Sequence, residues 1–267
     1  MYFRIYFPKI KIYIFTKVYE NMLSNDEVDI IIREKIAFKN PVVIGGFIGQ
    51  TPLGVTTSSY IVESLGMHEV AMVKSHHIPP VTVFVGGKMR NPFRIYSNAD
   101  GSVMVIQAEV PVDDEGLYTI SEALFKWIKQ FKPREFVVID GVPVQDIPEK
   151  RQAYLVAGPS RLEELAGKNI PPAEAALIAG FGGAILNESL MSGMNAIAML
   201  THVSTQIPDP DAVLAIIDGL NSIYNLKIPT EILEKSVEKI HEQISQIASE
   251  YKASQASDGD KEDPMYR

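Results

Sequence analysis

A glycine-rich segment is the first part of this sequence whose residues could do chemistry. The letters GGFIG at residues 45–49 follow a strand-like run at Pro41 to Ile44 and precede an expected helix from Leu53 to Leu65. Glycines in such a turn let backbone N–H groups approach an anion such as a phosphate. However, the full G-x-G-x-x-G spacing is missing, and no G-x-x-x-x-G-K-[ST] occurs in the sequence. We therefore expect a tight strand-to-helix turn in which glycine serves packing.

Carboxylates supply two further candidates. Asp140 follows a buried strand-like run, and α/β proteins collect their binding sites at the carboxyl ends of such strands. The sequence nominates no partner for this acid, so it defines no mechanism by itself. Asp113, Asp114 and Glu115 could form a carboxylate cluster. More simply, they place negative charge at the N-terminal end of the helix expected from Leu117.

Metal and nucleophile chemistry find little support. His76 and His77 are followed by Pro79 and Pro80, which predicts a turn and not the helical i, i+4 spacing of a zinc site. The other three histidines are isolated, and the sequence has no cysteine and no G-x-S-x-G motif. We therefore expect no metal, no cofactor and no catalytic residue.

The C-terminal end is better suited to binding a partner. Residues 253–264, ASQASDGDKEDP, contain no large apolar residue, which predicts a disordered acidic tether with a span of about 20 Å. After it come Met265, Tyr266 and Arg267. A terminal carboxylate can pair with a lysine, a tyrosine ring offers a large contact area with few rotors, and methionine fills irregular apolar pockets. The ending predicts a docking tail.

Strand and helix signals alternate along the middle of the chain. Leu117 to Phe131 has the apolar stripe of an amphipathic helix, and Phe136 to Ile139 is typical of a buried parallel strand. This alternation predicts an α/β domain at residues 26–228, with a largely parallel sheet covered by helices. Residues 1–25 form a separate extension, which is either a strand-like adhesive segment or a start-site artefact with Met22 as the true start.

A long amphipathic helix is expected at residues 229–252, before the tether and docking motif at 253–267. Thr230 is a good N-cap for this helix. Its apolar residues are spaced 4, 3, 4, 3 and 4 apart, which is a coiled-coil-type seam. The seam packs either on its own domain or on another subunit, and its residues are Leu233, Val237, Ile240, Ile244, Ile247 and Tyr251.

The bulk composition is that of an ordinary soluble protein. The 267 residues are 46% apolar and 22% charged, and the formal charge is −8. A negative chain repels phosphate backbones, so we expect no nucleic-acid partner. No run approaches the roughly 18 apolar residues of a membrane helix, and the absence of cysteine fits the cytoplasm.

Four stretches of the sequence carry a resemblance to a known family. They read GGFIGQTPLGVTTSSYIVESLG, IPPVTVFVGGKMRNPFRIYSN, IQAEVPVDDEGLYTISEALFKWIKQFKPREFVVIDGVPV and FGGAILNESLMSGMNAIAMLTHVSTQIPDPDAVLAIIDGLN. Over residues 40 to 250 the chain resembles the proteasome assembly chaperone family, in particular its archaeal members. The resemblance implies a three-layer α/β/α sandwich, similar in shape to nucleoside phosphorylases, and a homo-oligomer.

The resemblance also gives the tail a meaning. Some archaeal members end in a hydrophobic-Tyr-X (HbYX) motif, which Met265, Tyr266 and Arg267 match position by position. In proteasome activators this motif enters pockets between neighbouring α-subunits of the core-particle ring. The resemblance therefore implies a non-enzymatic assembly chaperone or an ATP-independent proteasome activator.

Two other classes of function stay open at this stage. One is a nucleotide- or nucleoside-binding, ligase-like enzyme that uses the GGFIG segment and Asp140, since the family has also been described as ATP-grasp-like. The sequence contains no nucleotide signature that supports this description. The other is a scaffold whose seam mainly drives self-association.

Overall fold

The computed structural model of the chain describes residues 28–34, 38–85, 87–148, 150–203 and 209–235. The predicted extension at residues 1–25, the tether and docking motif at 253–267, and most of the predicted long helix lie outside these ranges. Within them, residues 231–235 are helical, and the Glu234 N–H donates to the carbonyl of Thr230. No helix among the described residues is long and apolar enough to cross a bilayer.

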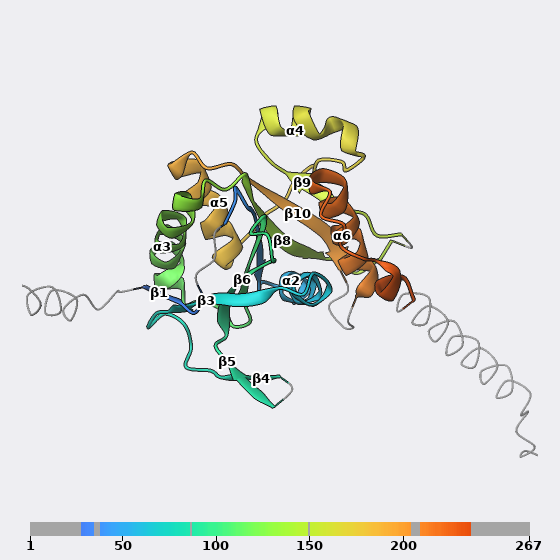
Figure 1. Cartoon of the computed structure of the whole chain (residues 1–267). Coiled ribbons are helices and arrows are strands. Elements are labelled where there is room, and N and C mark those ends of the chain that lie inside the picture. The colour runs from blue at the N-terminus through green and yellow to red at the C-terminus, as the bar shows by residue number, and fades with distance from the viewer. Residues whose placement is uncertain (1–27, 35–37, 86, 149, 204–208, 236–267) are drawn as a thin grey trace, which may run out of the picture.

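An eight-stranded sheet forms the centre of the molecule (Figure 1). In spatial order its strands are β1 (Asp29–Ile32), β3 (His68–Lys74), β6 (Phe93–Ser97), β7 (Val103–Ala108), β2 (Val42–Phe47), β8 (Glu135–Pro143), β10 (Ala196–Val203) and β9 (Tyr154–Val156). The four strands β7, β2, β8 and β10 are parallel, and their neighbours on both sides are antiparallel.

The prediction of a largely parallel sheet therefore holds for the centre and not for the edges. Parallel strands require a crossover of a dozen or more residues, and the helix α3 (Leu117–Ile128) lies in the crossover that leads from β7 past β2 to β8. Only the turn at residues 98–102 joins β6 to β7. There the Asn98 side-chain oxygen accepts from the Val103 N–H, and Gly101 takes a left-handed φ of 73°. So short a connection forces an antiparallel pair.

Helices cover both faces of the sheet (Figure 1). On one face lie α2 (Leu53–Ser64) and α6 (Pro210–Tyr224), and on the other lie α3 (Leu117–Ile128) and α5 (Gly180–Ser192). Short elements complete the described chain: α4 (Pro159–Leu165), the 3₁₀ turns η1 (Asp114–Gly116), η2 (Lys129–Phe131) and η3 (Ala166–Lys168), and the separate hairpin β4 (Val83–Val85) with β5 (Lys88–Arg90). This arrangement confirms the predicted α/β class.

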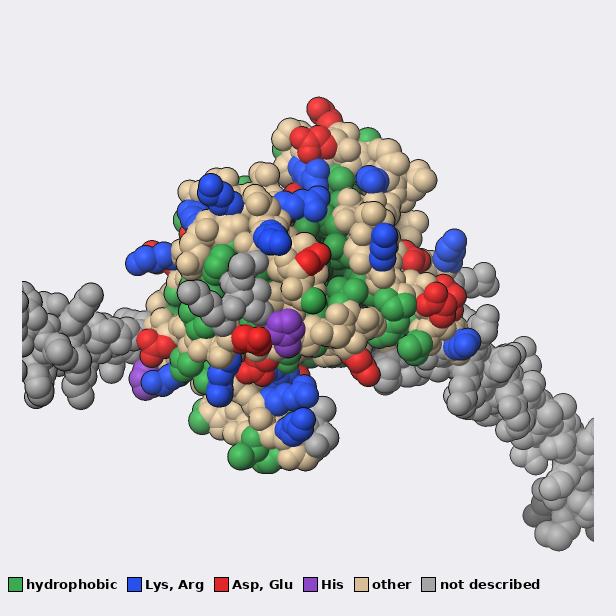
Figure 2. All heavy atoms as spheres, in the orientation of Figure 1, with side chains coloured by type: hydrophobic (Ala, Val, Ile, Leu, Met, Phe, Trp, Pro, Cys, Tyr) green, Lys and Arg blue, Asp and Glu red, His purple; other side chains and the backbone are tan. Residues whose placement is uncertain are grey.

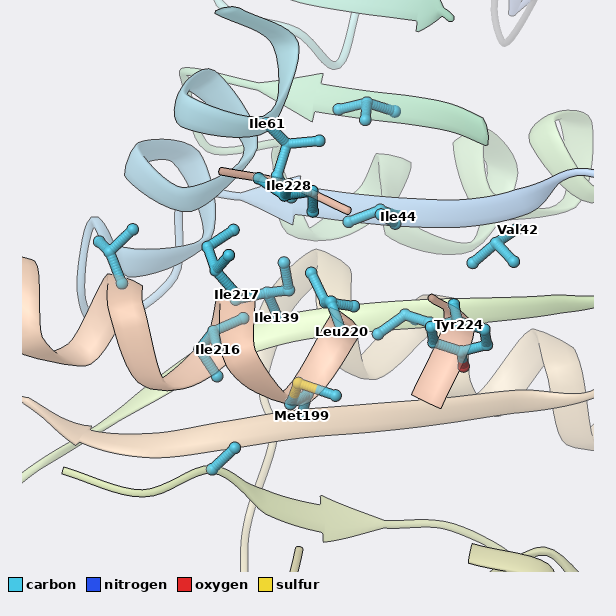
Figure 3. Packing of buried hydrophobic residues seen from close by; sticks show 14 of the residues in the cluster. Val42, Ile44, Ile61, Ile139, Met199, Ile216, Ile217, Leu220, Tyr224 and Ile228 are labelled. Atoms are coloured by element: carbon cyan, nitrogen blue, oxygen red, sulfur yellow. The ribbon is translucent and has the colours of Figure 1, made fainter. Parts of the chain in front are cut away.

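Each sheet face has its own apolar core, as the alternation of side chains along a strand requires. Figure 3 shows the core under α2 and α6, where Ile217 and Leu220 point toward Ile139 on β8 and Ile44 on β2. The opposite core lies under α3 and α5 and contains most of the large aromatic rings, including Phe125, which stacks on Phe136 at 5.8 Å between centroids. Adjacent residues of one strand thus serve different cores.

Candidate functional site

A pocket of about 470 Å³ lies where the central parallel strands end. Three of its walls come from the ends of β2, β7 and β8 and from the segments after β2 and β7, within residues 47–50, 108–114 and 140–143. The fourth wall is the loop before α5 and the first residues of that helix, at 175–181. The loop exposes Leu177, whose side chain is 90% accessible.

The position of the pocket follows from the chain path. After β2 the chain turns to one face to form α2, and after the adjacent strand β7 it turns to the opposite face to form α3. Two neighbouring parallel strands whose connections leave on opposite faces open a crevice between them. Such crevices are where open α/β sheets bind ligands.

Asp140 is the most distinctive group in the pocket wall. Its Oδ1 accepts a 2.8 Å hydrogen bond from the Gly141 N–H, and burial raises the pKa of its carboxyl above the usual range. No lysine or arginine among the described residues compensates this carboxylate. The sequence predicted Asp140 directly after the strand, whereas β8 continues to Pro143 and Asp140 is the first of its last four residues, which line the pocket.

The acidic run before α3 contributes to the same pocket. Asp113, Asp114 and Glu115 are all exposed, and of the three only Asp114, in η1, lines the cavity. The lining residues include no lysine or arginine. A wall of apolar groups and two carboxylates suits an apolar group that carries a positive charge, and it repels phosphates.

The predicted glycine turn at 45–49 needs a correction. Gly45 and Gly46 lie inside β2, and the turn begins only at Ile48. A Cβ on Gly46 would lie 2.1 Å from the Ser58 Oγ of α2, so this glycine lets the helix approach the strand. Gly49 alone reaches the pocket, where an added Cβ would lie 3.1 Å from the Asp140 Oδ1. The glycines therefore serve packing and offer no phosphate cradle.

The two adjacent histidines belong to a turn that packs against the segment before α3. His76 and His77 lie on a turn, as predicted, and the His77 carbonyl accepts from the Asp113 N–H at 2.9 Å. The His77 ring lies against the Cα of Gly116. No group of three potential metal ligands occurs among the described residues.

A second pocket, of about 480 Å³, lies beside the first and shares Val142 and Ala175 with it. Its polar groups come from Gln152, Tyr154, Glu174 and His202, and the rings of Tyr154 and His202 are 5.2 Å apart. Sequence reasoning missed this pocket because its residues come from β9, β10 and an irregular loop, with no common motif.

The residues predicted to bind partners fall mostly outside the described ranges. Met265, Tyr266 and Arg267 lie there, as do five of the six seam residues: Val237, Ile240, Ile244, Ile247 and Tyr251. Leu233 is described, is 8% exposed and packs in the core under α2 and α6. Its side chain is thus covered by its own domain. The tail motif and the rest of the seam stay predictions.

Solved structures of the same fold are known. The chain has 47% identity to a protein of unknown function from Thermoplasma acidophilum, with a TM-score of 0.71 over 84% of this chain and 92% of the other. Pyrococcus furiosus PbaA, an archaeal homologue of proteasome-assembly chaperone, gives 20% identity and a TM-score of 0.74 over 90% and 99%. Pyrococcus furiosus PbaB, an archaeal proteasome activator, gives 18% and 0.71 over 83% and 99%. Residues 43–248 match the sequence profile of the PAC2 family, and the chain belongs to that family.

Proposed function

We propose that this protein is a non-enzymatic partner of the proteasome in the cytoplasm, acting as an assembly chaperone or as an ATP-independent activator. The proposal rests on the C-terminal residues Met265-Tyr266-Arg267. They end a chain of the PAC2 family that shares its fold with PbaA and PbaB. The acidic pocket wall agrees with this proposal, because a nucleotide-dependent enzyme would need cations for its phosphates and the wall has none.

The tail acts as the docking element in this proposal. Tyr266 fills a pocket between neighbouring α-subunits of the core-particle ring, Met265 adds apolar contact, and the terminal carboxylate pairs with a basic group of the ring. The side chain of Arg267 contributes little, because the motif leaves its position free. Residues 253–264 provide the reach between domain and ring.

The domain acts as the platform in this proposal. It is a three-layer α/β/α sandwich of the nucleoside-phosphorylase shape, and the long C-terminal helix, with its apolar seam, joins copies into a homo-oligomer. Several tails then reach one ring at once. Linkage of this kind raises avidity by about 10² to 10⁴ even where each contact is weak.

A capture experiment tests the proposal. Core particles from the organism that encodes the chain are passed over immobilised full-length protein and over a version that lacks Met265 to Arg267. We expect the full-length protein to retain the core particle and the truncated version to lose it. Failure of both versions to retain it would contradict proteasome docking, and equal retention would contradict the role of the tail.

A further inference from the structure

The β4–β5 hairpin stands apart from the rest of the fold. It forms its own two-stranded sheet and projects away from the central sheet and its helices (Figure 1). Phe84 and Met89 face each other across it, and they are 68% and 75% exposed. A hairpin of three residues a side is marginally stable alone, and two large apolar side chains in water at its centre mark a contact surface.

The charge of this hairpin, which we term the arm, is opposite to that of the whole chain. Residues 75–99 contain no aspartate or glutamate, although the chain carries a net charge of −8. Lys88 and Arg90 belong to β5, on either side of Met89. Figure 2 shows hydrophobic and basic side chains together on this projection. The arm is therefore a basic, apolar ligand.

The pocket at the ends of β2, β7 and β8 is the matching receptor. Its walls are largely apolar, its charged groups are the carboxylates of Asp114 and Asp140, and no basic residue lines it. Ion pairs with Lys88 or Arg90 would compensate the Asp140 carboxylate, which has no cation beside it in the described part of the single chain. The apolar walls and the negative charge of the pocket thus favour the same occupant.

We propose that the arm of one copy of this chain docks in the pocket of a second copy. The root of the arm lies beside the pocket of its own chain, since the His77 carbonyl accepts from the Asp113 N–H next to Asp114. A twofold axis between two copies would let both arms dock in one closed contact. This proposal is independent of proteasome docking, because it concerns only contacts between copies of the chain.

Directed cross-linking tests the contact, since the natural chain has no cysteine. Full-length protein with Met89→Cys is mixed with full-length protein of different tag length that carries Leu177→Cys at the mouth of the pocket. Mild oxidation joins two chains only where their Cα atoms come within about 7 Å. We expect a disulfide-linked heterodimer, at least tenfold weaker when Phe84→Ser is added on the arm.

The matched control is Leu190→Cys in place of Leu177→Cys. Leu190 is similarly exposed, at 82%, but lies near the end of α5, away from the pocket lining. We expect little heterodimer from this pair. Equal heterodimer yields from the two pairs would overturn the proposal, and so would the absence of heterodimer from the Met89→Cys and Leu177→Cys pair. Either result would overturn it even if the copies associate through the C-terminal helix.

Discussion

Two charged groups of the sheet have opposite surroundings. Arg94, on β6, is 1% exposed, and its guanidinium donates to Glu109, to Gln107, to the Tyr96 hydroxyl and to the Asn91 carbonyl. Asp140, at the end of β8, is half-buried and accepts one hydrogen bond, from the next residue along the chain. The Arg94 guanidinium thus finds its hydrogen-bond partners within its own chain, whereas the Asp140 carboxylate can still accept further hydrogen bonds.

The difference separates structural from binding roles. The Arg94 network continues through Gln107, whose amide nitrogen donates to the hydroxyls of Ser58 and Ser59 on α2. It therefore ties the helix to the sheet, and the guanidinium of Arg94 has little donor capacity left for a partner. An uncompensated carboxylate in a pocket costs stability, which natural proteins retain mainly where function needs the group.

The largest expected effect comes from removing the saturated charge. Arg94→Leu leaves the Glu109 carboxylate largely buried without its cation, so the free energy of unfolding should fall by about 3–5 kcal/mol. Denaturant titration measures this loss. Arg94→Lys keeps the charge but not the planar fork, and it should fall between the wild type and Arg94→Leu. A loss below about 1 kcal/mol for Arg94→Leu would show that the network is not structural.

Substitutions at Gly46 in the interior and Gly49 at the pocket compare how the two regions tolerate an added side chain. Gly46→Ala forces a Cβ against Ser58 and the Gly54 carbonyl, so it should cost about 1–3 kcal/mol of unfolding free energy. Gly49→Ala meets only the end of the Asp140 side chain, which can shift, and should change stability by no more than about 0.5 kcal/mol. Equal losses in thermal unfolding would contradict this distinction.

The smallest expected change in unfolding free energy comes from Asp140, and it is a gain in stability and not a loss. Burial raises the pKa of this carboxyl in the folded state, so its ionisation destabilises the fold at neutral pH. Asp140→Asn should therefore raise the unfolding free energy at pH 7 by about 0.5 kcal/mol. The gain should fade as pH falls through the folded pKa, and vanish below the ordinary aspartate pKa of about 3.9, where both states are protonated.

The same variant should weaken the contact between copies. Because the asparagine side chain carries no charge, the yield of the Met89→Cys and Leu177→Cys heterodimer should fall when Asp140→Asn is present in the pocket chain. A variant that gains stability while losing association would place Asp140 in a binding role. A loss of stability at pH 7 would contradict the idea that its charge is left uncompensated.

Sequence periodicity predicted the elements well where one face is apolar. The helix from Leu117 was expected to reach Phe131, and the structure continues it to there as α3 and η2 before a left-handed Lys132. The buried strand predicted at Phe136 to Ile139 forms the first half of β8, which runs on to Pro143. Local patterns of this kind follow from side-chain burial, which the sequence carries directly.

Strand order and the pocket depend on contacts between distant segments, and the sequence does not carry those directly. The arm illustrates this limit: residues 81–85, VTVFV, are rich in β-branched residues, but the partner strand β5 is Lys-Met-Arg, which has no strand-like pattern. Leu177 lies in an irregular loop and lines the same pocket as Asp140 only in the folded chain. The position of Asp140 was predictable because a strand end is a local feature, whereas the rest of the pocket wall was not.

We propose that the end of the chain docks on the proteasome with Tyr266 as its main contact, and binding of purified core particle to two single variants tests this most directly. Tyr266→Ala should weaken binding of the full-length protein at least tenfold, because it removes the ring that fills the inter-subunit pocket. Arg267→Ala should leave binding within about twofold, because the motif leaves that position free. Equal losses from the two variants would contradict the pocket mechanism, and unchanged binding in both would show that the tail is not the docking element.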